Sequence, residues 1–286
     1  MSAKIIDGKA ISASCRVKIA EDTENFKKTY GFAPGLSVII VGEDPASKVY
    51  VRNKKLGCEQ VGFNSSVYEL PENTTREELN ALIDKLNADD SVHGILVQLP
   101  LPKHLDSEEV IARISPKKDV DAFHESNVGR IMIGNYSFLP CTPAGVMVLL
   151  KESGIDISGK ECVVVGRSNI VGKPMAMLLL QANGTVTICH SRTKDLSEVT
   201  RRADILVVAI GRADFITADM VKPGAVVIDI GMNRRADGKL TGDVDFASVS
   251  EIASYITPVP GGVGPMTITM LLQNTLISAE SFAKGK

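Results

Sequence analysis

The sequence has no tryptophan, few aromatic residues and almost no excess of charge of either sign. Aromatic side chains make up 5% of the 286 residues, and 32 Lys and Arg residues stand against 34 Asp and Glu residues. Proteins that bind nucleic acids or membrane surfaces use a concentrated basic field, so the near-neutral balance disfavours both classes. The length is enough for about two globular domains.

Long apolar runs are missing as well. No window approaches the roughly 18 consecutive apolar residues of a membrane-spanning helix, and residues 1–8 lack the apolar stretch of a signal peptide. The sequence therefore predicts a cytoplasmic protein.

Cysteine and histidine are scarce and scattered. The five cysteines include no C-x-x-C pair, and none has a histidine nearby at zinc spacing. We expect buried, reduced thiols and no metal site.

Short, β-branched apolar runs alternate with helical patterns, as is typical of parallel strands covered on both faces. The predicted strands are 36–41, 67–70, 94–99, 162–165, 186–189, 205–210 and 225–230. The predicted helices include 45–61, 75–87 and 266–283, and Thr75 with Glu78 forms a capping box at the start of the second. These patterns predict an α/β protein: two open α/β domains, the second a Rossmann-like parallel sheet, with a cleft between them.

Two segments rich in helix and strand breakers suggest the domain boundaries. In residues 139–145, Thr142 can cap a helix whose first residue is Pro143. Residues 257–265 form the second such segment, and a helix follows it. We therefore expect one domain at 1–139, joined by the C-terminal helix 266–286, and another at 140–265.

The strand at 162–165 runs directly into a glycine-containing turn and a helix. Such a turn points backbone N–H groups and the positive end of a helix at phosphate. Ser168 stands where the usual fingerprint has its second glycine, and Gly172 comes one residue late. Gly166, Arg167 and Ser168 are thus candidate dinucleotide contacts, although a glycine turn without a ligand has the same pattern.

The next strand favours NADP over NAD. NAD-binding folds carry an Asp or Glu at the end of this strand to bind the ribose 2′-hydroxyl. Here Ser191 and Arg192 follow the strand, and Arg167 adds a second cation. A hydroxyl and guanidinium groups suit a 2′-phosphate. The alternative for Arg192 is an ordinary solvated loop residue.

The first half holds a candidate catalytic group. Tyr50 and Lys54 are four residues apart, so they share one face of the helix 45–61. Gln98 lies at the end of a buried strand, and Asp121 closes a Lys-Asp-Val-Asp segment. Ligands bind at strand ends of open parallel sheets, so these side chains could face one crevice. Solvated lysines and turn residues are the alternative interpretation.

The chain resembles the bifunctional methylenetetrahydrofolate dehydrogenase/cyclohydrolase family, in its short bacterial form. The resemblance covers nearly the whole sequence and rests on several long motifs in one order. They lie at 47–54, 94–102, 118–121, 140–143, 166–174 and 255–267. Ala122 departs from the pattern, because the family usually has glycine there.

The resemblance implies a role for each candidate residue. Lys54 resembles the family's catalytic lysine and Gln98 the amide that orients it. Tyr50 resembles the aromatic residue that stacks against folate, and Asp121 the carboxylate that holds the pterin ring. The loop that begins with Pro260, Gly261 and Gly262 resembles the segment beside the folate and the nicotinamide. Gly166, Arg167, Ser168, Ser191 and the backbone near Met232 match cofactor contacts.

The implied activity is the NADP-dependent oxidation of 5,10-methylenetetrahydrofolate to the methenyl form, followed by hydrolysis to 10-formyltetrahydrofolate. The family further implies a homodimer and a place in one-carbon metabolism, which serves purine, methionine and histidine biosynthesis. Two alternatives are an NADP-dependent two-domain dehydrogenase of a small acid and a non-enzymatic dinucleotide sensor. The acid dehydrogenase would need a cationic clamp in the first half, and the sensor would need no reactive lysine.

Overall fold

The computed structural model describes residues 2–285, which divide into two compact units. Unit 1 contains residues 2–13 and 142–267, and unit 2 contains residues 14–141 and 268–285. The chain passes from one unit to the other within three helices, which are α1 (Gly8–Tyr30), α6 (Cys141–Glu152) and α10 (Val263–Lys284). Within residues 2–285, no helix is long and apolar enough to cross a membrane.

The N-terminal segment differs from the expected division of the chain. Its strand β1 (Lys4–Ile5) pairs in parallel with β11 (Tyr255–Ile256), which belongs to the larger sheet of unit 1. Backbone pairing over a separation of about 250 residues is invisible to local patterning. Residues 2–13 therefore cluster with the second half of the sequence.

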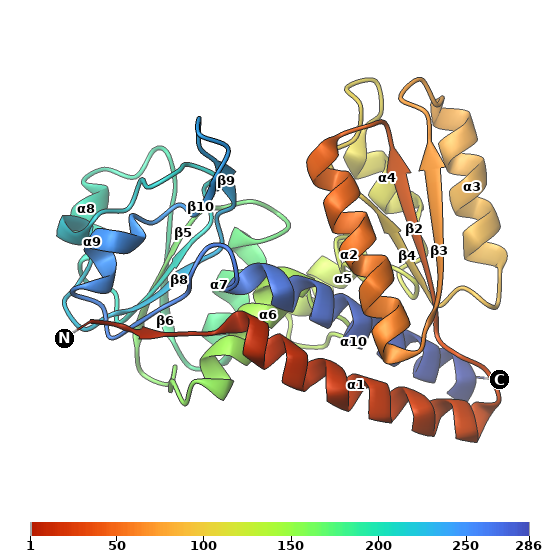
Figure 1. Cartoon of the computed structure of the whole chain (residues 1–286), viewed down its shortest axis with the longest axis horizontal. Helices are drawn as coiled ribbons and strands as arrows, with labels where there is room; N and C mark the ends of the chain where they lie inside the picture. The colour runs from red at the N-terminus through yellow and green to blue at the C-terminus, as the bar shows by residue number, and fades with distance from the viewer. Residues whose placement is uncertain (1, 286) are drawn as a thin grey trace. The chain divides into compact units, whose positions relative to one another are not determined.

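Unit 2 is built on a three-stranded parallel sheet in the order β3-β2-β4. The strands are β2 (Gly35–Val41), β3 (Asn64–Leu70) and β4 (Gly94–Val97). The helices are α2 (Pro45–Val61), α3 (Arg76–Ala88), α4 (Ser107–Arg113) and α5 (Glu125–Met132), and Figure 1 shows α2 and α3 beside the sheet. Every residue of β2 is buried, as expected of a central strand.

The apolar faces of α3 and α4 pack on one side of this sheet. Ile39 and Val41 of β2 form a cluster with Leu79 and Ile83 of α3 and Val110 of α4. The predicted capping box of α3 is confirmed, because the Thr75 and Glu78 side chains satisfy each other's backbone N–H groups. Local sequence thus starts the helix, and its apolar stripe fixes which face it buries.

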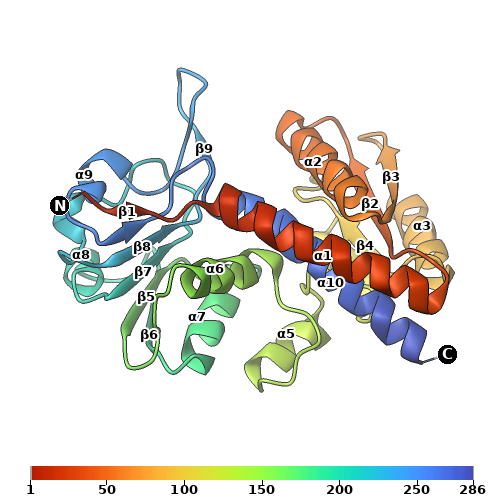
Figure 2. The ribbon, with the colours of Figure 1, turned by 60° about the horizontal axis from the view of Figure 1, so that its bottom comes forward.

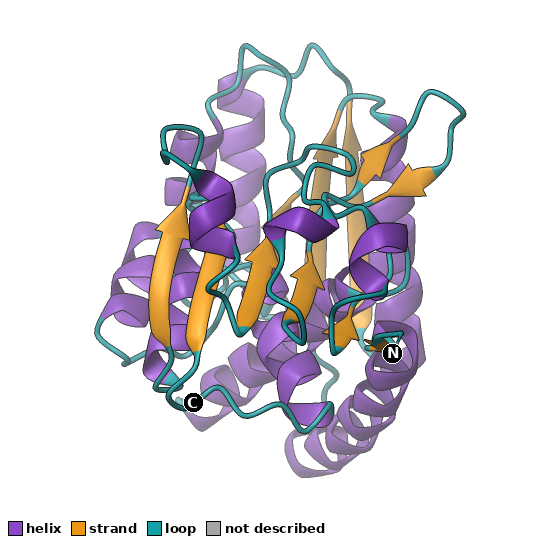
Figure 3. Cartoon of the chain, turned by 90° about the vertical axis from the view of Figure 1, so that its left-hand side faces the viewer, coloured by secondary structure: helices purple, strands orange, loops and turns teal. Residues whose placement is uncertain are grey.

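Unit 1 is built on a six-stranded parallel sheet in the order β1-β11-β8-β7-β5-β6, which is the Rossmann-like sheet that the sequence predicts. Its remaining strands are β5 (Glu161–Val165), β6 (Thr185–Cys189), β7 (Ile205–Val208) and β8 (Val226–Asp229). The central strands β7 and β8 are fully buried and apolar except for Asp229 at the end of β8. Figure 3 shows the strands of this sheet pointing the same way.

Helices and loops cover both faces of the six-stranded sheet. They include α7 (Gly172–Gln181), α8 (Leu196–Thr200), α9 (Phe246–Ser250) and the 3₁₀ helix η1 (Ala218–Met220). Figure 2 shows α6 and α7 on one side of the sheet and α8 and α9 on the other. A short antiparallel ribbon, β9 (Asn233–Arg234) with β10 (Leu240–Thr241), follows β8.

The strand order places a topological switch point in unit 1. From β5 the chain goes to β6 on one side, and it then crosses to β7 on the other side of β5. In open α/β sheets, ligands bind outside the carboxyl ends of the strands at such a point.

One predicted helix start is wrong. The helix predicted to begin at Pro143 behind a Thr142 cap begins at Cys141, so Thr142 lies inside α6. Its hydroxyl is bonded to the hydroxyl of Thr267 at 3.0 Å instead of capping the helix.

Candidate functional site

Helix α2 presents Lys54 to the end of strand β4. The helix starts firmly, because the Asp44 carboxylate accepts the Ser47 N–H at 2.8 Å and Pro45 occupies the first turn. Lys54 is only 7% exposed, and its Nζ donates a hydrogen bond to Oε1 of Gln98 at 2.9 Å. The predicted pairing of this lysine with an amide is therefore present in unit 2.

The orientation of Gln98 is fixed by its own backbone surroundings. Strand β4 ends at Val97, two residues earlier than the pattern predicts, so Gln98 and Leu99 lie beyond the ladder. The Gln98 Nε2 donates to the carbonyl oxygen of Leu99 at 2.7 Å, just before a cis bond to Pro100. With its nitrogen engaged there, the amide presents its oxygen to the amine.

Burial lowers the pKa of the Lys54 amine below its ordinary value of 10.5. Asp121, and more weakly the thiols of Cys141 and Cys58, act in the opposite direction. The hydrogen bond of the amine goes to a neutral oxygen, and within residues 2–285 no carboxylate holds it in the charged form through a direct hydrogen bond. The site thus favours an amine that can exist neutral closer to physiological pH.

Asp121 lies in the same electrostatic environment. Burial raises the pKa of its carboxyl, and the nearby Lys54 charge opposes that rise. The Sγ of Cys141 donates to Asp121 Oδ1 at 3.5 Å and to the Val120 carbonyl at 3.4 Å. Burial raises the pKa of this thiol well above its ordinary value, so it acts as a neutral donor.

The two carboxylates of the Lys-Asp-Val-Asp segment have separate tasks. Asp119 Oδ2 accepts hydrogen bonds from the His124 N–H and from Asn127 Nδ2, both at 2.8 Å, and so ties down the start of α5. Asp121 anchors no helix, and among the described residues its carboxylate accepts a hydrogen bond from the Cys141 thiol alone. Ala122 has a φ of +58°, in the left-handed region where glycine is at ease. The backbone at this position is therefore one that favours glycine, which accounts for the glycine usual in the family, and this chain adopts it with alanine.

Tyr50 lies one helical turn before Lys54. Its ring is half-buried, and burial raises the pKa of its hydroxyl, so the ring is a neutral aromatic surface with a polar tip.

Sequence reasoning missed two residues of this site. Cys141 was expected only as a buried thiol, although it lies in one of the family motifs. Asn274 of α10 donates through Nδ2 to the carbonyls of Val120 and Leu139, at 2.8 and 2.9 Å, and so fixes the backbone beside Asp121. No local signal could identify Asn274, because it is 153 residues from Asp121.

The glycine turn after β5 is tightly packed in unit 1. A Cβ at Gly166, which has a φ of +134°, would lie 2.3 Å from the Ala209 carbonyl oxygen, and one at Gly172 would lie 2.3 Å from the Gly166 oxygen. Ser168 Oγ accepts the N–H groups of Val171 and Gly172 at 3.2 and 3.3 Å. This serine thus closes the turn that starts α7.

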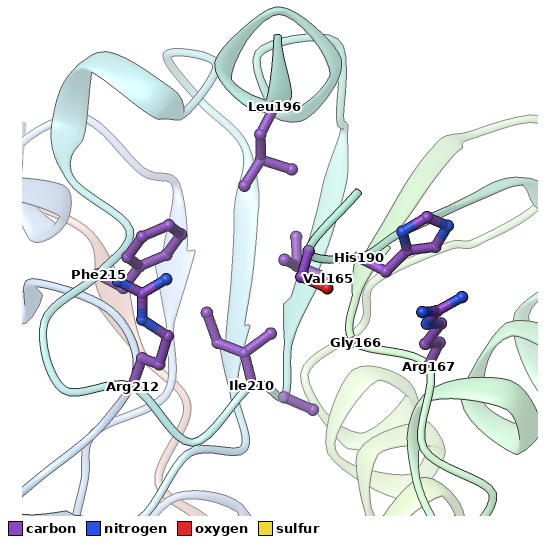
Figure 4. Close-up of a pocket in the computed structure, with 10 residues that line it drawn as sticks. Val165, Gly166, Arg167, His190, Leu196, Ile210, Arg212 and Phe215 are labelled. Carbon is purple, nitrogen blue, oxygen red and sulfur yellow. The ribbon is translucent and has the colours of Figure 1, made fainter. Parts of the chain in front are cut away.

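A pocket of about 310 Å³ opens at the switch point beside this turn. Its lining residues come from the carboxyl ends of three neighbouring strands, β5, β6 and β7, and from α8. They are Val165, Gly166, Arg167, His190, Ser191, Leu196, Ala209, Ile210, Arg212 and Phe215. Figure 4 shows Arg167 and His190 on one side and Arg212 and Phe215 on the other.

The pocket contains three of the predicted cofactor residues, namely Gly166, Arg167 and Ser191. Among the described residues, Ser168, Arg192 and Met232 are not part of its lining. Arg212, which the sequence analysis did not single out, supplies the second guanidinium and lies 4.1 Å from the centre of the Phe215 ring. This lining fits a phosphate-bearing dinucleotide. The two guanidinium groups and the hydroxyl can bind phosphate, and Gly166, which has no side chain, allows the ligand to approach the backbone.

The loop that carries Pro260, Gly261 and Gly262 belongs to unit 1. Gly261 has a φ of +110°, in the left-handed region that favours glycine. Gly8 packs tightly against this loop, because a Cβ on Gly8 would lie 1.8 Å from the Gly262 oxygen. Pro260 is exposed, and the bond before it is cis. Lys54 and its neighbours belong to unit 2.

Comparison with known proteins identifies the chemistry associated with this arrangement. The family described as "Tetrahydrofolate dehydrogenase/cyclohydrolase, catalytic domain" matches residues 6–121, and "Tetrahydrofolate dehydrogenase/cyclohydrolase, NAD(P)-binding domain" matches residues 140–283. The "Bifunctional protein FolD" of Acetivibrio thermocellus is 63% identical over 286 residues, which is all of both chains.

Two solved structures are also similar. A bifunctional FolD enzyme from Campylobacter jejuni is 54% identical with a TM-score of 0.95, and the match covers 98% of this chain and 99% of that one. The FolD of Trypanosoma brucei, complexed with NADP cofactor and an inhibitor, is 40% identical with a TM-score of 0.95 and 98% coverage of both chains. These likenesses favour the folate interpretation over a small-acid dehydrogenase or a dinucleotide sensor.

Proposed function

The chain belongs to the tetrahydrofolate dehydrogenase/cyclohydrolase family, and we propose that the residues around Lys54 carry the chemistry of its two folate reactions. It is an NADP-dependent bifunctional enzyme that oxidises 5,10-methylenetetrahydrofolate to the methenyl form and hydrolyses that form to 10-formyltetrahydrofolate. The observation that carries the proposal is the buried Lys54 amine, whose hydrogen bond goes to the neutral oxygen of Gln98.

The oxidation chiefly requires binding and orientation. NADP, when bound, accepts the hydride that leaves the one-carbon bridge. Arg167, Ser191 and Arg212 of the unit 1 pocket would hold its phosphates, while Gly166 lets the backbone approach closely. The half-buried Tyr50 ring offers a face on which the folate can stack.

Asp121 would hold the pterin ring. A pterin presents a 2-amino group beside a ring N–H, and one ionised carboxylate can accept both. Burial raises the pKa of the Asp121 carboxyl, and the two hydrogen-bond donors of the bound pterin would favour its ionised form. The Cys141 thiol also donates to Oδ1 of this carboxylate.

The hydrolysis requires a proton carrier. Water adds to the cationic methenyl carbon and loses one proton to a base. A proton then returns to the ring nitrogen as its bond to this carbon breaks, and the remaining hydroxyl proton leaves to solvent as the formyl C=O forms. A lysine in water is almost fully charged at neutral pH and cannot serve as that base. Burial and the cationic substrate both favour the neutral amine of Lys54, and Gln98 aims it without adding negative charge.

Other features of the family belong to the same proposal. We expect this chain to work as a homodimer in the cytoplasm and to supply one-carbon units for purine, methionine and histidine biosynthesis. The NADP-binding part would comprise residues 140–265 together with residues 2–13, which cluster with them, and the folate-binding part the rest of residues 1–139 together with the C-terminal helix.

A Lys54→Met variant tests the proposal. Hydrolysis of methenyltetrahydrofolate should fall by about 10²-fold to 10⁴-fold, the usual contribution of a positioned proton carrier. The affinity for folate should change little, because the buried alkyl chain is retained. Lys55→Met is the matched control, since Lys55 is the exposed neighbour on the same helix. Hydrolysis by Lys54→Met at a rate near that of Lys55→Met would refute the role.

A further inference from the structure

A fully buried carboxylate lies behind the dinucleotide pocket and is not explained by the chemistry above. Asp243 follows β10 and is 0% exposed. Its Oδ2 accepts the backbone N–H groups of Ile210 and Gly211 at 2.7 and 3.0 Å. Its Oδ1 accepts the Arg212 N–H at 2.8 Å and the side chain of Asn233, also at 2.8 Å. One carboxylate therefore binds three consecutive N–H groups of the segment that follows β7.

This segment forms one wall of the pocket. Ile210, Arg212 and Phe215 line it, and the Arg212 guanidinium lies over the Phe215 ring (Figure 4). The backbone of Asp243 also stabilises this segment, because its carbonyl oxygen accepts the N–H groups of Phe215 and Ile216 at 2.8 and 3.0 Å. The wall is thus organised around Asp243 by both its side chain and its backbone.

A second buried carboxylate fixes Asp243 itself. Asp229, at the end of β8, accepts the N–H groups of Asp243, Val244 and Gly231, each at 2.9 Å. The packing leaves no room for side chains there. A Cβ on Gly242 would lie 1.8 Å from Asp229 Oδ2, and one on Gly231 would lie 2.2 Å from Asp243 Cγ.

A carboxylate is the one side chain suited to this position. Four N–H donors converge on two oxygens, and an ionised carboxylate has acceptor sites for all of them and no hydrogen to clash. An asparagine at this position would replace one of the two oxygens by an NH₂ group, which is a donor and would face other N–H donors. A buried donor left without an acceptor is costly, so the segment would have to move.

We propose that Asp243 is a positioning residue for the NADP site. Its carboxylate holds the backbone of residues 210–212 in place, so that Arg212 contacts the bound dinucleotide. This rests on the assignment of NADP to the unit 1 pocket. Asp243 touches no reacting atom and acts through the N–H groups that it binds. Hydrolysis of methenyltetrahydrofolate needs no NADP and uses unit 2 residues, so it serves as an internal measure of intact enzyme.

The test is Asp243→Asn in the full-length enzyme, with NADP binding measured by isothermal titration calorimetry. The Kd for NADP should rise by about 10-fold to 100-fold, as expected when a charge-assisted hydrogen-bond set is broken. Methenyltetrahydrofolate hydrolysis should stay within about twofold of the wild type, and hydrogen exchange at residues 210–212 should become faster.

Asp214→Asn is the matched control. Asp214 lies in the same loop, but its carboxylate binds Arg235 and the Thr241 hydroxyl and makes no bond to residues 210–212. Its NADP affinity and its exchange at those residues should match the wild type. Unchanged NADP affinity in Asp243→Asn, or an equal loss in Asp214→Asn, would overturn the proposal.

If Asp243→Asn does not fold, the Arg212→Gln variant tests the proposal instead. It changes a pocket-lining side chain but leaves the carboxylate and its three N–H partners in place. NADP affinity should fall while exchange at Ile210 and Gly211 stays at the wild-type rate. NADP affinity equal to that of the wild type would overturn the proposal. A wild-type enzyme that bound no NADP would instead overturn the assigned function.

Discussion

Replacing Gln98 by Glu should move the pH dependence of hydrolysis upward. The change keeps the shape of the side chain but places a negative charge about 3 Å from the Lys54 amine, where Oε1 now lies at 2.9 Å. At an effective dielectric constant of about 20, the attraction is about 5 kcal/mol. Burial of the new carboxylate offsets about half of it.

The remaining 2 to 3 kcal/mol corresponds to a rise of about 2 units in the pKa of the amine. The neutral fraction of Lys54 at a fixed pH below that pKa falls about 100-fold, and the rate of hydrolysis should fall with it. The loss of methenyltetrahydrofolate absorbance, followed from neutral to alkaline pH, gives the rate and the position of the profile. The rate should recover as the pH rises, because deprotonation restores the base.

Gln60→Glu provides the matched control. It adds the same charge at an exposed position on the same helix, where solvent screens it. Its profile should match the wild type. A Gln98→Glu profile that also matched the wild type would refute the view that the amine must be neutral to work.

Two further changes separate binding from proton transfer and test the cofactor. Asp121→Asn should weaken folate binding and lower both activities together by about 10-fold or more, because the amide cannot accept hydrogen bonds from both pterin donors. Titration with a folate ligand and assays of both rates check this. A loss confined to hydrolysis would contradict it. Arg167→Gln should lower the ratio of kcat/KM for NADP to that for NAD by about 10-fold, since a charge-assisted contact to the 2′-phosphate is lost; an unchanged ratio would show that Arg167 does not bind that phosphate.

Local patterns predicted the strands and several helix boundaries well. The α2 boundaries match the prediction, and the α3 capping box forms as predicted, because both depend on residues within one or two turns. The end of β4 did not follow its pattern. The pattern predicted a strand through Leu99, but the chain leaves the sheet after Val97, so Gln98 and Leu99 lie outside β4.

Contacts between distant segments could not be predicted from one sequence. Arg212 reaches the pocket because β7 lies beside β5, and that adjacency is a property of the sheet order. Asp243 and Asn274 act through backbone groups far away in the chain, so their surroundings leave no local signature. Arg192 carries the residue type expected of a phosphate ligand, yet Arg212 lines the pocket and Arg192 does not.

Direct titration of the Lys54 amine tests the central claim most closely. Carbon-13 labelling of the lysine side chains allows its resonance to be followed by NMR, and the Lys54→Met variant assigns it. We predict a midpoint below the ordinary value of 10.5, because burial disfavours the ammonium form and Gln98 offers no compensating charge. A midpoint at or above that value would contradict the account, since the amine would then be charged when hydrolysis requires a base.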